Sequence, residues 1–285
     1  GGARRAKATR KEQATKAESG SYTGWQLPLM SAQLSAVVEK ELRYASRNAQ
    51  LRVIAVMAVG LTIVLRLSPL GSARRGINFL GIYGEGAGAV FSVLYIFTLV
   101  SPLTTNLFGY DGAGMRSLVL APVSGRRLLV GKNIACMVVT LALAVAGVIA
   151  GGLVLRDLTW QTLLFAALSY VVFAALFSTG GNWMSLHFPK RVQFGKRMNR
   201  SGVAAFIMLP LFVLMLVPPA IAVAGGYAAG SLLVKYAILA AFAILSVCAY
   251  LLLINGQGRS LERRELEILE AVTGRSGDED GQIMN

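Results

Sequence analysis

The fold of this protein is decided by long apolar stretches, of which residues 133–155 are an example, with the sequence NIACMVVTLALAVAGVIAGGLVL. Neither 142–155 nor 203–224 shows the polar face that a surface helix of a water-soluble protein has. Six such stretches, at 51–70, 77–104, 133–155, 158–186, 203–226 and 230–254, are each near or above the ~20 residues that cross a bilayer. The sequence therefore predicts an all-α membrane protein with six transmembrane helices.

The composition supports this class and argues against a nucleic-acid-binding protein. The mean hydropathy is +0.59 and 55 % of the residues are hydrophobic, which does not suit a water-soluble globule. The formal net charge is +14, but the basic residues flank the apolar stretches and are not interleaved with aromatic side chains. Topology control and attraction to anionic lipid explain that placement, so we expect a lipid bilayer as partner and no nucleic acid.

The basic residues also predict how the chain is oriented. Of the 28 Lys and Arg residues, 23 lie in the segment up to Arg52, in the second and fourth loops and in the tail. The other five lie in the first, third and fifth loops. Positive residues collect on the cytoplasmic side, so both termini are expected in the cytoplasm of a cell whose inner or plasma membrane holds the protein.

The segments outside the six-helix domain, 51–256, are expected to differ in character. Residues 1–30 are predicted to be a disordered basic linker, and the sequence is expected to be a fragment of a longer chain that starts within this linker. Residues 31–50 have apolar residues three or four apart, such as Leu34, Val37 and Val38, which predicts an amphipathic helix along the inner interface or a merely solvated helical lead-in. Residues 257–285 predict a cytoplasmic helix, begun by Ser260 and stopped at Gly274, followed by an acidic tail.

One acidic residue lies inside a predicted span. Glu85 falls within a glycine cluster at the start of the second span, where small residues three or four apart form a packing face. An acid at membrane depth is a functional candidate by default. The alternative is that Glu85 pairs near the interface with Arg66, Arg74 or Arg75.

Glycine and proline are expected to interrupt two later spans. The fourth span is predicted to break at Gly180-Gly181. The fifth contains Pro210, Pro218 and Pro219, each of which removes a backbone donor and kinks a helix. Such kinks mark a gate in some membrane proteins and serve packing in others, and the sequence leaves both open.

The sequence has few residues of the kinds that catalyse reactions or bind metal ions. The single histidine, His187, and two cysteines inside predicted spans do not make the usual zinc sites or a disulfide framework. The nearest match to an ATP-binding P-loop, Gly125 to Lys132, has five intervening residues instead of four and Asn133 in the hydroxyl position. We therefore expect no enzyme activity, no metal and no cofactor in this chain.

The loop at 106–133 is too regular in pattern to be a passive connector. Its glycines and Asp111 predict a turn out of the second span. A short amphipathic helix follows from Met115 and ends at Ala121-Pro122, because the residue before proline disfavours helix. Ser124 is expected to start a further short helix at the cytoplasmic edge of the third span. A helix held crosswise beneath the membrane could transmit force from a soluble partner to the spans.

These residues carry a resemblance to a known family. The run from Asn106 to Asn133 resembles the cytoplasmic loop of ABC transporter permeases of the exporter-like second type, with a Phe-Gly-x-Asp-Gly-x-Gly turn, a Leu-rich segment, Pro-Val-Ser and Gly-Lys-Asn. The segment 181–191 is similar to a second family segment, and Glu39-Lys-Glu-Leu-Arg43 is similar to the family's lead-in helix. The resemblance extends over roughly residues 36 to 272 in the expected order.

The resemblance implies a six-helix half that pairs with a second half, from the same or a different chain. It also implies a separate cytoplasmic subunit that binds ATP and Mg and docks on a coupling helix in this loop, with transport, by analogy export, driven by its ATP hydrolysis. Some members carry two halves, so the chain could be the second half of a longer permease. The residues implied at the contact are Gly109, Asp111, Gly112, Gly114, Pro122, Arg126 and Arg127.

Two other functions stay open at the level of sequence. A secondary, ion-coupled transporter needs ionisable groups or broken helices near mid-membrane, for which Glu85 and the prolines of the fifth span are candidates. A membrane assembly factor without transport activity is the other. The sequence does not identify a cargo.

Overall fold

The structure, a computed structural model, describes residues 24–67, 78–155, 158–189 and 202–273. Over these residues the chain is helical and has no strand. The elements are α2 (Ala32–Arg47), α3 (Ala49–Leu67), η2 (Asn78–Gly84), α5 (Ala87–Thr104), η3 (Gly112–Gly114), α6 (Met115–Leu120), α7 (Gly125–Leu155), α8 (Trp160–His187), α9 (Gly202–Ala229) and α10 (Leu232–Thr273).

Five helical segments within the described residues are long and apolar enough to cross a membrane: Gly81–Thr104, Gly125–Leu153, Trp160–His187, Met208–Ala229 and Leu232–Thr273. The described residues are thus helical throughout their regular structure, with helices of the length and composition found in multi-pass membrane proteins. The first expected stretch is also helical, as α3, but α3 is not one of these five. The predicted linker up to residue 23, the basic segment at 190–201 and the acidic tail lie outside the described residues.

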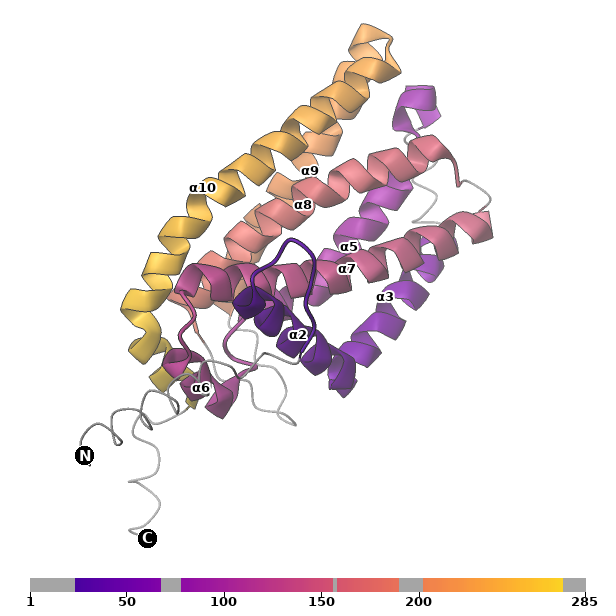
Figure 1. Cartoon of the computed structure of the whole chain (residues 1–285). Helices are drawn as coiled ribbons and strands as arrows, with labels where there is room; N and C mark the ends of the chain where they lie inside the picture. Colours follow the sequence, from indigo (N-terminus) through magenta and orange to yellow (C-terminus); the bar gives the residue numbers. More distant parts are fainter. Residues whose placement is uncertain (1–23, 68–77, 156–157, 190–201, 274–285) are drawn as a thin grey trace, which may run out of the picture.

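The helices form one bundle with two distinct ends (Figure 1). We call one end, where α2, α6 and the last turns of α10 lie, the α6 end; the opposite end holds η2 and the start of α8. Helix α8 packs against α5, α9 and α10, and α7 packs against α2, α3, α5 and α10. The site considered below is therefore built at the α6 end, where the short helix α6 contacts α10.

Aromatic side chains fill the middle of the bundle. Phe97 of α5 and Phe173 and Phe177 of α8 are fully buried. The ring of Phe97 lies 5.0 Å from that of Phe177 and 6.1 Å from that of Phe173, both edge to face. Lipid tails are as apolar as these rings, so close packing rather than escape from water favours this arrangement.

The second expected span differs from the structure at its start. It was predicted as one helix from residue 77, but α5 begins only at Ala87. Gly81 and Gly86 have φ of 53° and 86°, left-handed values that glycine adopts readily and other residues rarely do. A Cβ at Gly86 would also lie 3.1 Å from Phe165 and 3.2 Å from the Cα of Thr162. The glycines therefore supply a bend and a close contact with α8.

Two predicted interruptions are absent from the described helices. Helix α8 runs through Gly180-Gly181, so the expected break there is wrong. A Cβ at Gly181 would meet the carbonyl oxygen of Thr104 at 3.0 Å, so this glycine brings α5 close to α8. Helix α10 likewise continues past residue 254 to Thr273, and Ser260 does not begin a new helix. Glycine costs a helix only about 1 kcal/mol, which close packing outweighs.

Helices α7 and α10 cross at two glycines. A Cβ at Gly258 would lie 2.7 Å from the backbone nitrogen and 2.8 Å from the Cα of Arg126. A Cβ at Gly125 would lie 2.5 Å from the carbonyl oxygen of Gly258. Beside this contact, Glu262 accepts a hydrogen bond of 2.8 Å from the backbone N–H of Gly125, and so satisfies a free donor at the start of α7. The last turns of α10 are thereby fixed to α7.

The crossing can be tested with one methyl group. We expect Gly258→Ala to lower the stability of the protein by about 1–3 kcal/mol, because the new Cβ meets backbone that cannot move aside. Gly256→Ala is the matched control: it lies in the same helix, but its Cβ would meet no atom within 4 Å. Thermal unfolding of the purified protein in detergent measures both. Equal melting temperatures for the two variants would contradict the close crossing.

Candidate functional site

The 106–133 loop forms a series of tight turns followed by a short helix. Backbone hydrogen bonds run from Gly109 to Asn106 (3.1 Å), from Asp111 to Phe108 (3.1 Å) and from Gly114 to Asp111 (2.8 Å). Gly112 has φ of 51°, the left-handed conformation that a turn needs from glycine. The glycines and Asp111 therefore form turns here, as the sequence predicted.

Two helices follow these turns. Helix α6 starts at Met115 and ends at Leu120, and Ala121 before the proline is extended, with ψ of 140°. Helix α7 then runs from Gly125 to Leu155 without interruption. The N–H of Leu128 donates to the carbonyl of Ser124 at 3.0 Å. Ser124 therefore precedes a long helix, instead of the separate short one that was expected.

A buried lysine lies directly under the turn. The ammonium of Lys132 is 2.6 Å from Oδ2 of Asp111, 2.8 Å from Oε1 of Glu41 and 3.1 Å from the carbonyl oxygen of Leu107. Oδ1 of Asp111 accepts a further hydrogen bond of 2.5 Å from Lys40. We call Lys40, Glu41, Asp111 and Lys132 the Lys132 cluster. It joins α2, the turn after α5 and α7 at one point.

The Lys132 cluster is internally balanced. The side chain of Lys132 is only 2 % exposed and that of Asp111 7 % exposed. A buried charge is tolerated when it is paired and its hydrogen-bonding capacity is used. Lys132 has three N–H donors and three acceptors, and the two lysines face two carboxylates. Removing Lys132 would leave the two carboxylates without their buried partner.

Burial and charge act on the ionisable groups around the turn. Burial alone would raise the pKa of Asp111, but Lys132 and Lys40 outweigh it and hold this pKa below its ordinary value. Burial raises the pKa of Tyr110 to about 12, and it also raises the pKa of Tyr44. At neutral pH, Asp111 is therefore ionised while both tyrosines beside it stay uncharged.

An apolar layer supports the loop from beneath. Phe108, Met115 and Leu129 are fully buried and belong to one cluster with Ile268 and Val272 from the last turns of α10. Helix α6 also contacts α10 directly. An isolated helix of six residues is not stable in water, so this layer gives α6 its order.

The residues that the resemblance implied at a partner contact separate into two groups. Gly109 is buried and Asp111 nearly so, whereas Gly114, Pro122, Arg126 and Arg127 are exposed. Gly112 lies between the two groups with intermediate exposure. That all of them contact a partner stays a prediction. Within the chain, the carboxylate of Asp111 is taken up by two lysines.

Helix α2 also braces the exposed group. The guanidinium of Arg127 donates to Oε1 of Gln33 at 2.5 Å, and the amide nitrogen of Gln33 donates to the carbonyl of Pro122 at 3.1 Å. Helix α2 itself is capped by Ser31, whose hydroxyl accepts from the N–H of Leu34. The start of α2, the Pro122 segment and the start of α7 are thus joined by side-chain hydrogen bonds.

Sequence reasoning did not find Lys132 and Glu41 as a buried pair. In the sequence, Lys132 is notable only as the end of the near-miss P-loop, and Glu41 only as part of the lead-in segment. A signal was present, since Lys132 is the one charged residue between Leu128 and Leu155. What the sequence lacked was the partner, because Glu41 lies 91 positions away.

The opposite end of the bundle holds a second polar contact. Oε1 of Glu85 accepts a 2.6 Å hydrogen bond from Thr159, and Lys235 donates to the carbonyl of Glu85 at 3.0 Å. Lys235 is 0 % exposed and lies 4.1 Å from the ring centroid of Phe165. The charge count grouped Lys235 with the fifth loop, although it falls within the expected stretch 230–254, and the structure buries it in the first turn of α10. The expected pairing of Glu85 with Arg66, Arg74 or Arg75 lies outside what the structure describes.

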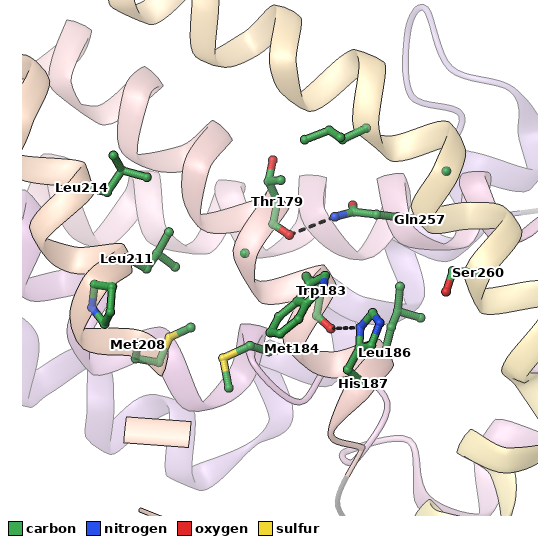
Figure 2. Close-up of a pocket in the computed structure, with 14 residues that line it drawn as sticks. Thr179, Trp183, Met184, Leu186, His187, Met208, Leu211, Leu214, Gln257 and Ser260 are labelled. Atoms are coloured by element: carbon green, nitrogen blue, oxygen red, sulfur yellow. Dashed lines mark hydrogen bonds between the residues drawn. The ribbon is translucent and has the colours of Figure 1, made fainter. Parts of the chain in front are cut away.

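A cavity of about 590 Å³ lies between α8, α9 and α10 (Figure 2). His187 lies at its edge, and its Nδ1 is 2.8 Å from the carbonyl oxygen of Trp183. Both cysteines are unpaired. Among the described residues, no three or more His, Cys, Asp or Glu side chains are grouped so as to hold a metal ion.

Comparison of the chain with protein-family models, with curated proteins and with solved structures finds no match. What the site can do is therefore argued from its geometry and from the resemblance of the loop.

The cluster predicts unequal roles for its two lysines. We expect Lys132→Met to lower the free energy of unfolding by about 3–5 kcal/mol, because Glu41 and Asp111 then lose the buried cation they share and keep only the half-exposed Lys40. Lys40→Met should cost about 1 kcal/mol or less, because the Lys40 side chain is 43 % exposed. Thermal or denaturant unfolding in detergent compares them. A Lys132→Met variant no less stable than Lys40→Met would contradict the buried bridge.

The lowered pKa of Asp111 predicts an acid-sensitive contribution. A carboxylate whose pKa is lower in the folded than in the unfolded state stabilises the fold above the unfolded value, here near 3.8, and that contribution is lost as pH falls through the folded pKa. We expect the melting temperature of wild type to fall more steeply than that of Asp111→Asn as the pH is lowered from about 6 toward about 3. Carboxyl groups ordinarily titrate in this range of pH. Parallel curves would show that Asp111 titrates normally.

Proposed function

We propose that this chain is the membrane-spanning permease subunit of an ATP-binding-cassette transporter, which exports an unidentified substrate with ATP hydrolysed by a separate cytoplasmic subunit. The observation that carries the proposal is a surface at the α6 end whose side chains are exposed and whose backbone is held by contacts with the helix bundle. We call it the docking face. Its exposed residues are Arg116, Leu120, Pro122, Arg126 and Arg127.

The chemistry of the docking face suits a protein partner. Leu120 is 84 % exposed although it is a large apolar residue, and arginines lie before and after it in the chain. Arginine is enriched at protein interfaces, where it combines an apolar stem with several donors. A partner that covers Leu120 and offers carboxylates to Arg126 and Arg127 would complement this surface.

The supports beneath the docking face connect it to the long helices. The Lys132 cluster ties the turn to α2 and α7, and Glu262 ties the start of α7 to α10. A displacement of α6 therefore moves groups on three helices. Transport energised in this way requires a partner whose contacts differ between its nucleotide states, since a ligand shifts an equilibrium only by its differential affinity.

The distribution of charge supports a cytoplasmic α6 end. Among the described side chains, the exposed arginines of α6, of the first turn of α7 and of α10 from Arg259 onward lie toward this end. The described lysine at the opposite end, Lys235, is buried. By the positive-inside rule the docking face then meets the cytoplasm, where an ATP-binding subunit would be.

The proposal includes α3 as the sixth crossing helix. It is 19 residues long, close to the ~20 that a bilayer requires, and Val53, Val56 and Val64 on it are exposed. Exposed valines suit contact with lipid or with a second six-helix half. That second half, from the same or another chain, would complete the transporter.

The docking face can be tested by charge reversal. We expect the double variant Arg126→Glu/Arg127→Glu to lose the ATP-binding subunit and its transport-coupled ATPase activity on purification from the native membrane, because two like charges would meet the partner's carboxylates. Arg47→Glu is the matched control, since Arg47 is exposed at the far end of α2. Equal melting temperatures would show that the double variant is folded.

The same preparation separates the proposal from its rivals. Substrate flux that follows an ion gradient with no ATPase bound would favour a secondary transporter. For that function, the contact of Glu85 with Thr159 and the buried Lys235 would be the place to look. A stable complex without flux or ATPase activity would favour an assembly factor.

A further inference from the structure

The cavity between α8, α9 and α10 is a groove with apolar walls. Figure 2 shows Leu211 and Leu214 of α9 on one side and Gln257 and Ser260 of α10 on the other, with Trp183 of α8 between them. Gly256 also lines it, and a Cβ at that position would meet no atom within 4 Å. Gly256 is exposed, so the groove opens at this position to the surface of the bundle, between three helices that are long and apolar enough to cross a membrane.

The polarity of the groove changes along its length. The chain runs toward the α6 end in helix α8 and away from it in helix α9. His187 and Ser260 therefore lie at the end of the groove nearest the α6 end, while Leu211, Leu214 and Leu253 line the part further from that end, where Leu214 and Leu253 are each 50 % exposed. Gln257 lies between, and its amide is engaged by Asn182 at 2.9 Å and by the carbonyl of Thr179 at 3.0 Å. The walls are thus mostly apolar along the groove and polar at the end nearest the α6 end.

The volume of the groove favours a flexible chain over a helix. An α-helix is about 10 Å wide with its side chains and rises 5.4 Å per turn, so one turn occupies roughly 400 Å³. A groove of about 590 Å³ would accept little more than one turn of a neighbouring helix. Its volume is within the range of about 300–1,000 Å³ found for small-molecule sites. A gap left empty would forfeit the contacts of every atom that lines it.

We propose that this groove binds one acyl chain of a membrane lipid, with the hydroxyl-bearing headgroup of that lipid at His187 and Ser260. The apolar depth and the polar mouth match the two parts of such a molecule. The mouth lies where α8 ends at His187 and α10 approaches the α6 end, which is where the proposal places the lipid headgroup. The site is independent of the ATP-driven function proposed above and requires only that the bundle lies in a bilayer.

The hydrogen bonds at the mouth specify the headgroup. Nδ1 of His187 faces a carbonyl oxygen, which can only accept, so Nδ1 carries the proton. With the proton on Nδ1, Nε2 presents a lone pair that can accept a hydrogen bond from a ligand hydroxyl. The hydroxyl of Ser260 has no hydrogen-bond partner among the described residues. A glycerol headgroup supplies hydroxyl donors, whereas a choline headgroup has none.

The test uses the full chain in lipid nanodiscs with a photoreactive diazirine in one acyl chain. Two probes are compared, phosphatidylglycerol and phosphatidylcholine with the same labelled chain. After irradiation, mass spectrometry locates the cross-linked residues. We expect phosphatidylglycerol to label the groove residues of α8, α9 and α10 more strongly than the exposed face of α7, and more strongly than phosphatidylcholine does.

Two variants separate the chain-binding from the headgroup-binding part. Gly256→Leu fills the open space, and labelling in the groove should fall to the level seen on α7. Gly60→Leu is its matched control, because Gly60 on α3 also opens on empty space and lies outside the groove. His187→Phe should keep labelling in the groove but remove the preference for phosphatidylglycerol.

Three results would overturn the proposal. One is labelling spread evenly over all exposed helix faces. Another is a Gly256→Leu variant that has the melting temperature of wild type and is still labelled in the groove as strongly as wild type. The third is a disulfide-linked dimer of Gly256→Cys in a Cys248→Ser background, which would assign the groove to a second copy of the chain. Equal groove labelling by both probes in wild type would overturn the headgroup assignment.

Discussion

The ammonium of Lys132 is the constraint around which the α6 end of the protein is organised. A lysine enclosed in a helix bundle is costly unless carboxylates compensate its charge, and here those carboxylates come from two other segments. The turn after α5 and the helix α2 are therefore held against α7 by a requirement of charge balance. Apolar contacts alone would allow these segments to slide, whereas three directed hydrogen bonds fix their register.

Close approach of helix backbones is the second organising feature. Gly86, Gly181 and Gly258 each lie where a side chain would collide with a neighbouring helix, on α8, α5 and α7 respectively. In a membrane such contacts replace the hydrophobic effect as the source of association. The Lys132 cluster and the glycine contacts act at different places, since the cluster orders the α6 end and the glycine contacts hold the apolar helices together.

The sequence predicts more of the fold than of the site. Apolar length locates the helices, and Gly112 and Asp111 predict the turn, because these signals are local in the chain. The error at Gly180-Gly181 arose because glycine was interpreted by its helix propensity, while the neighbour that requires it, Thr104, is remote. Likewise the pairing of Glu41 with Lys132 and the burial of Lys235 depend on contacts across many residues, which single-sequence patterns do not encode.

Helix α10 has a consequence for how the two ends of the molecule communicate. Its 42 residues form one uninterrupted rod of roughly 63 Å at 1.5 Å per residue, about twice the thickness of a bilayer's hydrocarbon core. Lys235 is in its first turn, and Ile268 and Val272 are in its last ones. One continuous helix therefore links the apolar layer under α6, through Ile268, to the contact between Lys235 and the carbonyl of Glu85 at the other end of the bundle.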